Sequence, residues 1–233
     1  MGHLSSPPAL GDSPRLEAFS DGVFAFAATL LVVALEVPST VAELEQVLLG
    51  FVPFTLSFGT LIALWSVHRA FFRRFPLGDR TTVALNSCLL FVVLFYVYPL
   101  KFLARGLATM IFGRGFGAGG SAEGIQSLAE LAKLFAWYAG GFAAIFLFVA
   151  LLYRHGARCA PALGYSDARR DEARFWARHY TILCAVGLLS LLMAVADIGV
   201  RIGMPGWIFA LLGPLCGAHG FWSARRAAAR AER

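Results

Sequence analysis

Polar side chains that could pair with one another or meet ions stand at the start of the first apolar segment of the chain. This segment, Leu16–Val37, is long and apolar enough to cross a bilayer, yet it carries Ser20 and Asp21, and Arg15 directly precedes it. A carboxylate at the edge of a membrane span is costly unless it pairs with another group or faces water. These residues are therefore candidates for ion pairing, for hydrogen bonds between helices, or for ion entry.

Three further polar side chains are expected at the same membrane depth. Trp65 and His68 share one face of the second apolar segment near its end, and Asn86 lies near the start of the third. The cluster is interpreted either as a polar staple that fixes three helices together or as a gating or ion-entry site, and the residues alone favour the staple. No second metal ligand stands at coordinating spacing beside His68, so neither a metal site nor a cofactor is expected.

The middle of the first segment has one face of small and bulky apolar residues. Gly22, Phe26, Thr29, Leu30 and Val33 recur at spacings of three and four, which places them on the same side of a helix. If this face lines a pore, it forms a hydrophobic constriction that can gate by dewetting. Otherwise it is ordinary helix packing, which the helix phase alone favours.

The composition indicates an integral membrane protein built from helices. The chain has 233 residues, of which 58% are hydrophobic and 15% charged, with a mean hydropathy of +0.69. A soluble domain is nearer half apolar and a quarter charged. We therefore expect an all-α membrane protein with six transmembrane helices, each of about 20 apolar residues. The six candidate spans are Leu16–Val37, Val47–Phe71, Thr81–Leu103, Leu128–Tyr153, Phe175–Ala196 and Pro205–Ser223. Only Asp197–Met204 separates the last two, and it is expected to be a tight polar turn.

The net charge of +6 reflects an unequal distribution of basic residues rather than a nucleic-acid-binding surface. The smaller set is Lys101, Arg105, Arg114, Lys133 and Arg201, and the larger set flanks the opposite ends of the spans. The positive-inside rule then places both termini in the cytoplasm, and the protein is expected in the cell membrane. The larger set is Arg15, Arg69, Arg73, Arg74, Arg80, Arg154, Arg158, Arg169, Arg170, Arg174, Arg178, Arg225, Arg226, Arg230 and Arg233.

The segments outside the spans suggest three parts and no catalytic motif. Residues 1–14 are expected to be a disordered cytoplasmic N-terminus, 15–224 a six-helix domain and 225–233 a basic cytoplasmic tail. The glycine-rich stretch Thr109–Gln126 lacks the GK[ST] ending of a phosphate-binding loop and is expected to be a linker. Charges of alternating sign near Asp167–Arg174 predict a solvated helical extension. No spacing of residues points to hydrolysis or nucleotide binding, so an enzyme is not expected.

Beyond these arguments, the first three segments resemble one known family. The pattern Arg15-x-x-x-Phe19-Ser20-Asp21-Gly22-Val-Phe-Ala, followed by Thr29-Leu30-Leu31-Val32 and Pro38, resembles the signature of the transmembrane protein 175 family of lysosomal potassium channels and their prokaryotic relatives. Trp65-x-x-His68 and Asn86 with Pro99 are similar to that family's second- and third-helix motifs. The resemblance implies a homotetramer that conducts potassium in preference to sodium, without a carbonyl filter, through a central pore lined by the first helix.

The resemblance also implies roles for individual residues. Phe26, Leu30 and Val33 would form the pore constriction, with Thr29 as the neighbouring hydroxyl. Members of the family are expected to have an aliphatic residue at the position of Phe26. The resemblance therefore does not identify which of these layers is the narrowest part of the pore. The implied partners are further copies of the chain, the lipid bilayer and potassium ions. The polar network around the pore helix would consist of Arg15, Ser20, Asp21, Trp65, His68 and Asn86.

Two other functions remain open on the sequence. A non-conducting scaffold or accessory subunit would use the polar residues only to hold helices together, and its Phe26 face would pack dry against another span. A proton-coupled transporter is the weaker alternative, in which His68 and Asp21 would control a pH-dependent flux.

Overall fold

The computed structural model describes residues 13–33, 39–112 and 127–231. Within these ranges every regular element is helical, which confirms the expected all-α class. The predictions made for residues 1–12, for Pro38 and for most of the glycine-rich stretch lie outside the described residues. The elements are α1 (Ser13–Val33), α2 (Val41–Leu49), α3 (Phe51–Arg74), α4 (Arg80–Phe112), α5 (Leu128–Cys159), α6 (Asp167–Val195), the 3-10 turn η3 (Val200–Ile202), α7 (Met204–Trp207), the 3-10 turn η4 (Ile208–Leu211) and α8 (Leu212–Ala231).

Four described helical segments are long and apolar enough to cross a membrane. They are Val47–Arg74, Arg80–Gly106, Leu128–Cys159 and Asp167–Val195. The first predicted span overlaps α1, which carries charged residues in its opening turns, and the last is divided among α7, η4 and α8. The fold is therefore that of an integral membrane protein, with four spans defined by length and composition alone.

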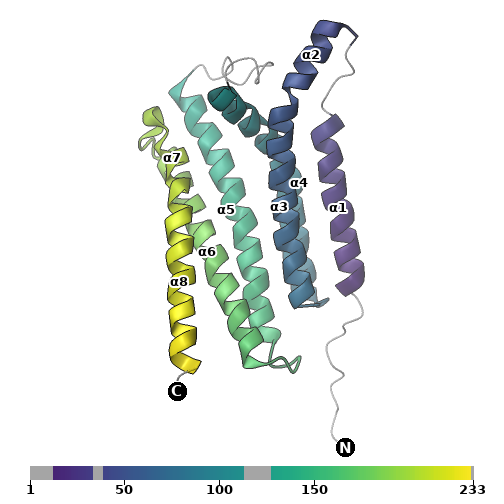
Figure 1. The fold of residues 1–233 in the computed structure, drawn as a ribbon, viewed down its shortest axis with the longest axis vertical. Helices are drawn as coiled ribbons and strands as arrows, with labels where there is room; N and C mark the ends of the chain where they lie inside the picture. The colour runs from purple at the N-terminus through teal and green to yellow at the C-terminus, as the bar shows by residue number, and fades with distance from the viewer. Residues whose placement is uncertain (1–12, 34–38, 113–126, 232–233) are drawn as a thin grey trace, which may run out of the picture.

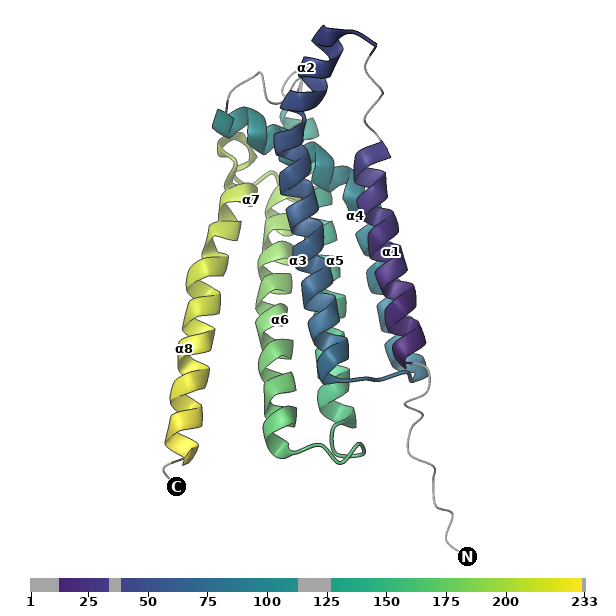
Figure 2. The same ribbon diagram turned by 45° about the vertical axis from the view of Figure 1, so that its right-hand side comes forward.

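The long helices lie side by side and alternate in direction (Figures 1 and 2). α1 packs on α3 and α4, α4 also packs on α5, and α5 and α6 form the most extensive helix pair. α8 lies at the edge of the bundle and packs on α6. The start of α1 and the end of α8 lie at the same end of the bundle (Figure 1). We call this end, which also contains the links from α3 to α4 and from α5 to α6, the arginine end.

An aromatic cluster fills the core at the arginine end. Phe71 contacts Tyr153 with ring centroids 5.2 Å apart in a T-shaped arrangement, and Tyr153 lies 5.5 Å from Tyr180. Phe75 and Trp176 pack on the same tyrosine. Tilted and edge-to-face rings pack favourably because the positive edge of one ring meets the negative face of another. This cluster joins α3, α5 and α6 at their ends, so the arginine end is a firmly packed part of the bundle.

The third span is longer than the sequence predicts. α4 continues through Pro99 and ends at Phe112, whereas the sequence places the end of the span near Leu103. Proline removes one backbone donor from a helix, and membrane helices tolerate this because neighbouring groups compensate for the lost bond. The first four residues of the predicted linker Thr109–Gln126 are therefore helical, and residues 113–126 lie outside the described part.

Two predicted features near α6 are confirmed. The helix begins at Asp167 with Ser166 as its N-cap, so the charged stretch before the fifth span is a helical extension. The turn predicted between the last two spans is tight, with left-handed backbone at Gly199 (φ 66°) and Gly203 (φ 72°). Glycine adopts this conformation without the steric cost that a Cβ would impose.

Candidate functional site on the first helix

One face of α1 is packed into the bundle. Ser20, Phe24, Ala27 and Leu31, at spacings of four, three and four, are buried against α3 and α4. Because these spacings follow the helical repeat, the buried residues form a single stripe. The stripe contains one polar side chain, Ser20, which has no exposed surface.

A directed chain of hydrogen bonds satisfies this buried serine. Its Oγ donates to the Leu16 carbonyl at 2.7 Å and accepts from Asn86 Nδ2 at 2.9 Å. The Oδ1 atom of Asn86 lies 2.7 Å from His68 Nε2, and because an amide oxygen only accepts, Nε2 carries the proton. His68 Nδ1 is buried without a hydrogen-bond partner in the described part of the chain. The bonds link α1, α3 and α4 at one level.

A second contact joins α1 to α3 nearer the surface. Trp65 donates from its indole Nε1 to Asp21 Oδ1 at 2.8 Å. The Arg69 guanidinium lies over the Trp65 ring, 5.3 Å from its centroid. The indole N–H gives the Asp21 carboxylate a hydrogen-bond donor, which offsets part of the cost of a carboxylate at the membrane edge. We refer to Ser20, Asp21, Trp65, His68 and Asn86 together as the polar cluster.

Arg15 is the one member of the predicted network that stands apart. It is exposed at the start of α1, and no hydrogen bond or ion pair reaches it within the part of the chain that the structure describes. The polar cluster thus assembles from five of the six predicted residues.

The opposite face of α1 is uncovered in the single chain. Phe19, Gly22, Phe26 and Thr29 are all exposed, and Phe26 exposes 57% of its surface. Thr29 donates its hydroxyl to the Phe26 carbonyl at 2.7 Å, so its polar atom is satisfied within the helix. Leu30 is half-buried and packs partly on the core. Val33 ends α1, and its side chain lies outside the described residues. Within residues 13–33, 39–112 and 127–231, no helix therefore packs over Phe26, as a dry packing face inside one chain would require.

Lys101 is a positioning residue that sequence reasoning missed. Its Nζ donates to the Leu31 carbonyl at 3.2 Å, across from α4 to the last turn of α1. The final carbonyls of a helix have no partner within the helix, and a cation there also meets the negative end of the helix dipole. The sequence placed this lysine at the outer membrane edge, but a bond to a carbonyl 70 residues away has no local signal. α1 is thus anchored near both ends.

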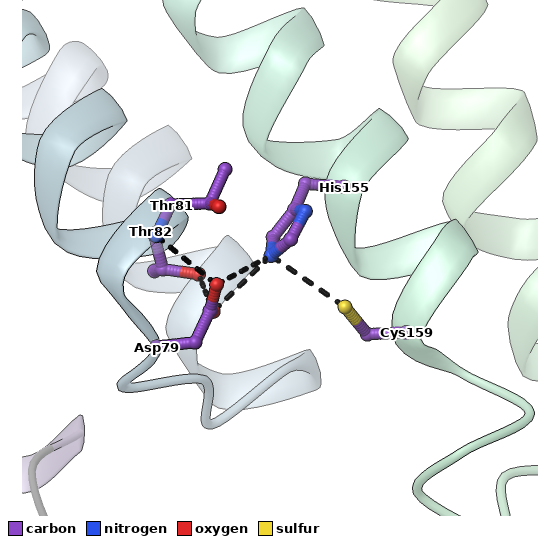
Figure 3. A network of polar contacts seen from close by, with 5 residues as sticks. All are labelled: Asp79, Thr81, Thr82, His155 and Cys159. Atoms are coloured by element: carbon purple, nitrogen blue, oxygen red, sulfur yellow. Dashed lines mark hydrogen bonds and ion pairs between the residues drawn. The ribbon is translucent and has the colours of Figure 1, made fainter. Parts of the chain in front are cut away.

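A third polar group holds the start of α4. Asp79 accepts from the backbone N–H of Thr81 and from the Thr82 hydroxyl, and His155 Nε2 of α5 lies 3.0 Å from its Oδ2 (Figure 3). The sulfur of Cys159 lies 3.5 Å from the same Nε2. Because one ring nitrogen serves both neighbours, the histidine cannot relay a proton from the thiol to the carboxylate. The group is a structural clamp that fixes the helix bearing Asn86.

The clamp also sets the charge state of Asp79. Burial alone would raise the pKa of this carboxyl, but the bonds from Thr82, His155 and the Thr81 N–H favour the anion more strongly, so its pKa is lowered from 3.8. In the described part of the chain, no three His, Cys, Asp or Glu side chains lie close enough to hold a metal ion.

The fold and the site together define an all-helical membrane protein whose first helix is held by polar contacts on one face and left uncovered on the other. The family model of the endosomal/lysosomal potassium channel TMEM175 matches residues 15–96, which contain the whole polar cluster. A curated potassium channel from Marivirga tractuosa is 37% identical over 186 residues, covering 78% of this chain and 75% of the relative. The chain therefore belongs to the TMEM175 family of potassium channels.

Solved structures of the family agree with the fold. A crystal structure of a variant of the potassium channel MtTMEM175, in complex with a nanobody–MBP fusion protein, matches with a TM-score of 0.80 and 33% identity, covering 91% of this chain and 93% of that one. A lysosomal potassium-selective channel TMEM175 homolog from Chamaesiphon minutus matches with a TM-score of 0.50 and 26% identity over 86% of this chain and 98% of that one. The prediction that the chain is not an enzyme is confirmed on this ground, since its family and relatives are channels.

Proposed function

We propose that the chain assembles as a homotetramer and forms a potassium-selective channel, with α1 of each subunit lining a central pore. The observation that carries the proposal is the two-sidedness of α1. One face is bound to α3 and α4 through Ser20 and the residues in phase with it, and the other face has no cover from the described part of the same chain. Relatives named as potassium channels, one of them as potassium-selective, support the choice of ion.

In the proposed topology, the chain crosses the cell membrane six times and has both termini in the cytoplasm. α1 supplies the first crossing, and the consecutive elements α7, η4 and α8 supply the last. The start of α1 and the end of α8 lie at the same end of the bundle, in keeping with an even number of crossings (Figure 1). Arg74, Arg80, Arg158 and Arg170 also lie at the ends of helices that meet there, and the positive-inside rule assigns this end to the cytoplasm.

The proposed constriction is hydrophobic. Fourfold symmetry turns each uncovered side chain of α1 into a ring of four, so Phe26, Leu30 and Val33 would make successive apolar layers beside the Thr29 hydroxyls. Such a neck passes ions only when it is wetted or when the ion sheds part of its water. Phe26 exposes 57% of its surface and Leu30 packs partly on the core, so the Phe26 layer is the proposed narrowest point.

The polar cluster is proposed to position the pore helix rather than to carry ions. Ser20, His68 and Asn86 are 0%, 2% and 0% exposed, and each bonds to another member of the cluster. A buried, mutually satisfied set of polar groups fixes helices at a defined register. This favours the polar staple over an ion-entry site, while the pore itself is assigned to the other face of α1.

Cation flux from proteoliposomes tests the proposal. Purified protein is reconstituted, and efflux is compared under a potassium gradient and a sodium gradient. We expect faster potassium flux, and we expect Leu30→Ser to raise the flux and to lower the preference for potassium. Leu56→Ser, on the exposed face of α3, is the matched control and should behave as the wild type. Absence of flux for both cations in the wild type and in Leu30→Ser, with the tetramer intact, would favour a scaffold.

A further inference from the structure

A basic pocket lies between α5 and α6, apart from the polar cluster of α1. Its volume is about 320 Å³. Alanine side chains and Thr181 form part of its wall, and the rest of its lining is arginine. The five arginines, which we call the arginine pocket, are Arg154 and Arg158 from α5 and Arg170, Arg174 and Arg178 from α6.

The spacing of these arginines places them on one face of α5 and one face of α6. Arg154 and Arg158 are four apart, and the three arginines of α6 follow one another at intervals of four. Residues four apart in a helix lie on the same face. α5 and α6 are the most extensively packed pair in the fold, so the two basic stripes border one groove. At 1.5 Å per residue, the stripe on α6 is about 12 Å long.

The positive charge of the pocket is poorly neutralised. Asp171 pairs with Arg174 at 3.2 Å, and the neighbouring Glu172 is directed to Arg74 of α3 at 2.8 Å. The nearby Arg169 stacks on the Tyr165 ring instead of entering the groove. Arg170 Nε is buried and has no hydrogen-bond partner within the described residues. Like charges four apart repel, and a buried N–H without an acceptor is costly, so a bound anion would stabilise the pocket.

The position of the pocket indicates what kind of anion fits. It lies at the arginine end of two helices that are long and apolar enough to cross the membrane, where headgroups meet protein. Guanidinium groups bind phosphate through paired, charge-assisted hydrogen bonds, and basic pockets between membrane helices bind phosphate-bearing lipid headgroups. A cavity of this volume holds a headgroup, while the acyl chains would follow the apolar sides of α5 and α6.

We propose that the arginine pocket binds the phosphate of an anionic phospholipid headgroup, which bridges α5 and α6. The inference rests on the proposed membrane orientation but not on ion conduction. Inorganic phosphate has the same chemistry, and the position at the membrane end favours the lipid as its source.

Native mass spectrometry of the full-length, delipidated protein tests the proposal. The protein is titrated with dioleoylphosphatidylglycerol, with dioleoylphosphatidylcholine, and separately with inorganic phosphate. We expect the anionic lipid to bind about tenfold or more tightly than the zwitterionic one, because each arginine near the membrane adds attraction. Arg158→Gln combined with Arg178→Gln should weaken the anionic lipid about tenfold and leave the zwitterionic lipid unchanged. Both arginines are exposed, so the fold should tolerate their loss.

A second pair of substitutions separates the pocket from a general effect of charge. Arg225→Gln with Arg226→Gln removes the same charge from α8, where the two arginines stack on Phe221 and Trp222. This variant should bind the anionic lipid as the wild type does. Equal losses in both double variants would overturn the proposal, and so would binding of inorganic phosphate that blocks the lipid at matched concentrations. Both outcomes can be read whether or not the protein conducts.

Discussion

Asn86 of α4 donates a hydrogen bond to Ser20 of α1 at 2.9 Å, and both side chains are fully buried. The same amide accepts from His68 of α3, so one residue connects three helices. Hydrogen bonds between membrane helices are individually modest, but a buried group left without a partner is costly. The uncovered face of α1 therefore owes its orientation to a contact on the opposite side of the helix.

Replacement of the central amide should loosen α1. Asn86→Ala leaves the His68 Nε2 donor without its acceptor and removes the donor to Ser20, so we expect the free energy of unfolding to fall by about 1–3 kcal/mol. Thermal unfolding in detergent, followed by loss of the folded oligomer, measures the effect. Ser87→Ala on the exposed side of α4 should change stability by no more than about 0.5 kcal/mol. An equally small effect of Asn86→Ala would argue against the hydrogen-bonded cluster.

The Trp65–Asp21 contact should show a measurable coupling energy. Trp65→Phe removes the indole donor and Asp21→Asn removes the charge of the acceptor, so a double-mutant cycle should give about 0.5–1.5 kcal/mol. Pairing Trp65→Phe with Glu130→Gln, at the opposite end of the bundle, provides the control, and these changes should add. A coupling near zero for both cycles would mean that the bond contributes nothing.

Loss of the lysine that reaches α1 should weaken the last turn of that helix. Lys101→Met removes the donor to the Leu31 carbonyl at nearly constant side-chain length. We expect amides in the last turn of α1 to exchange roughly fivefold faster, which corresponds to about 1 kcal/mol of lost local stability. Hydrogen exchange followed by mass spectrometry measures this. Lys133→Met on α5, an exposed lysine, should leave exchange in α1 unchanged.

The Asp79 clamp predicts a loss of stability in acid. The folded state lowers the pKa of this carboxyl below 3.8, so the clamp stabilises the protein fully above that value. Its contribution is lost as the pH falls from there through the lowered pKa of the folded state. Asp79→Asn should be less stable than the wild type near neutral pH, and the difference should shrink in acid. A difference that is constant across the pH range would show that the charge of Asp79 has no part in it.

Much of the fold follows from local sequence signals. The apolar runs locate α3, α4, α5 and α6, since each is a continuous segment of span length. The end of α4 is misplaced because the apolar run weakens at Lys101 and Arg105, so the predicted span stops at Leu103, whereas the helix continues to Phe112.

In the candidate site, too, some residues could be predicted from the sequence and others could not. Ser20, His68 and Asn86 are recognisable because polar residues inside apolar segments need partners at the same depth, and the structure brings them together. The resemblance to the family groups Arg15 with them, but Arg15 lies outside their contacts in the described part of the chain. The Asp79–His155 contact joins residues 76 apart in sequence, and the arginine pocket depends on the packing of two helices. The Asp79–His155 contact has no local pattern that would reveal it, and the arginines four apart on α5 and α6 do not by themselves reveal that the two stripes border one pocket.

Water access to α1 tests the central claim most directly. Cys88, Cys159, Cys184 and Cys216 are first replaced, and a single cysteine is then introduced at Phe26 or, as the matched control, at the adjacent buried Ala27. Membrane-impermeant charged thiol reagents are applied to proteoliposomes while potassium flux is recorded. A pore lined by the uncovered face of α1 predicts rapid block with Phe26→Cys and no block with Ala27→Cys. Flux that continues unchanged with Phe26→Cys, with the thiol unmodified, would contradict the assignment of the pore to α1.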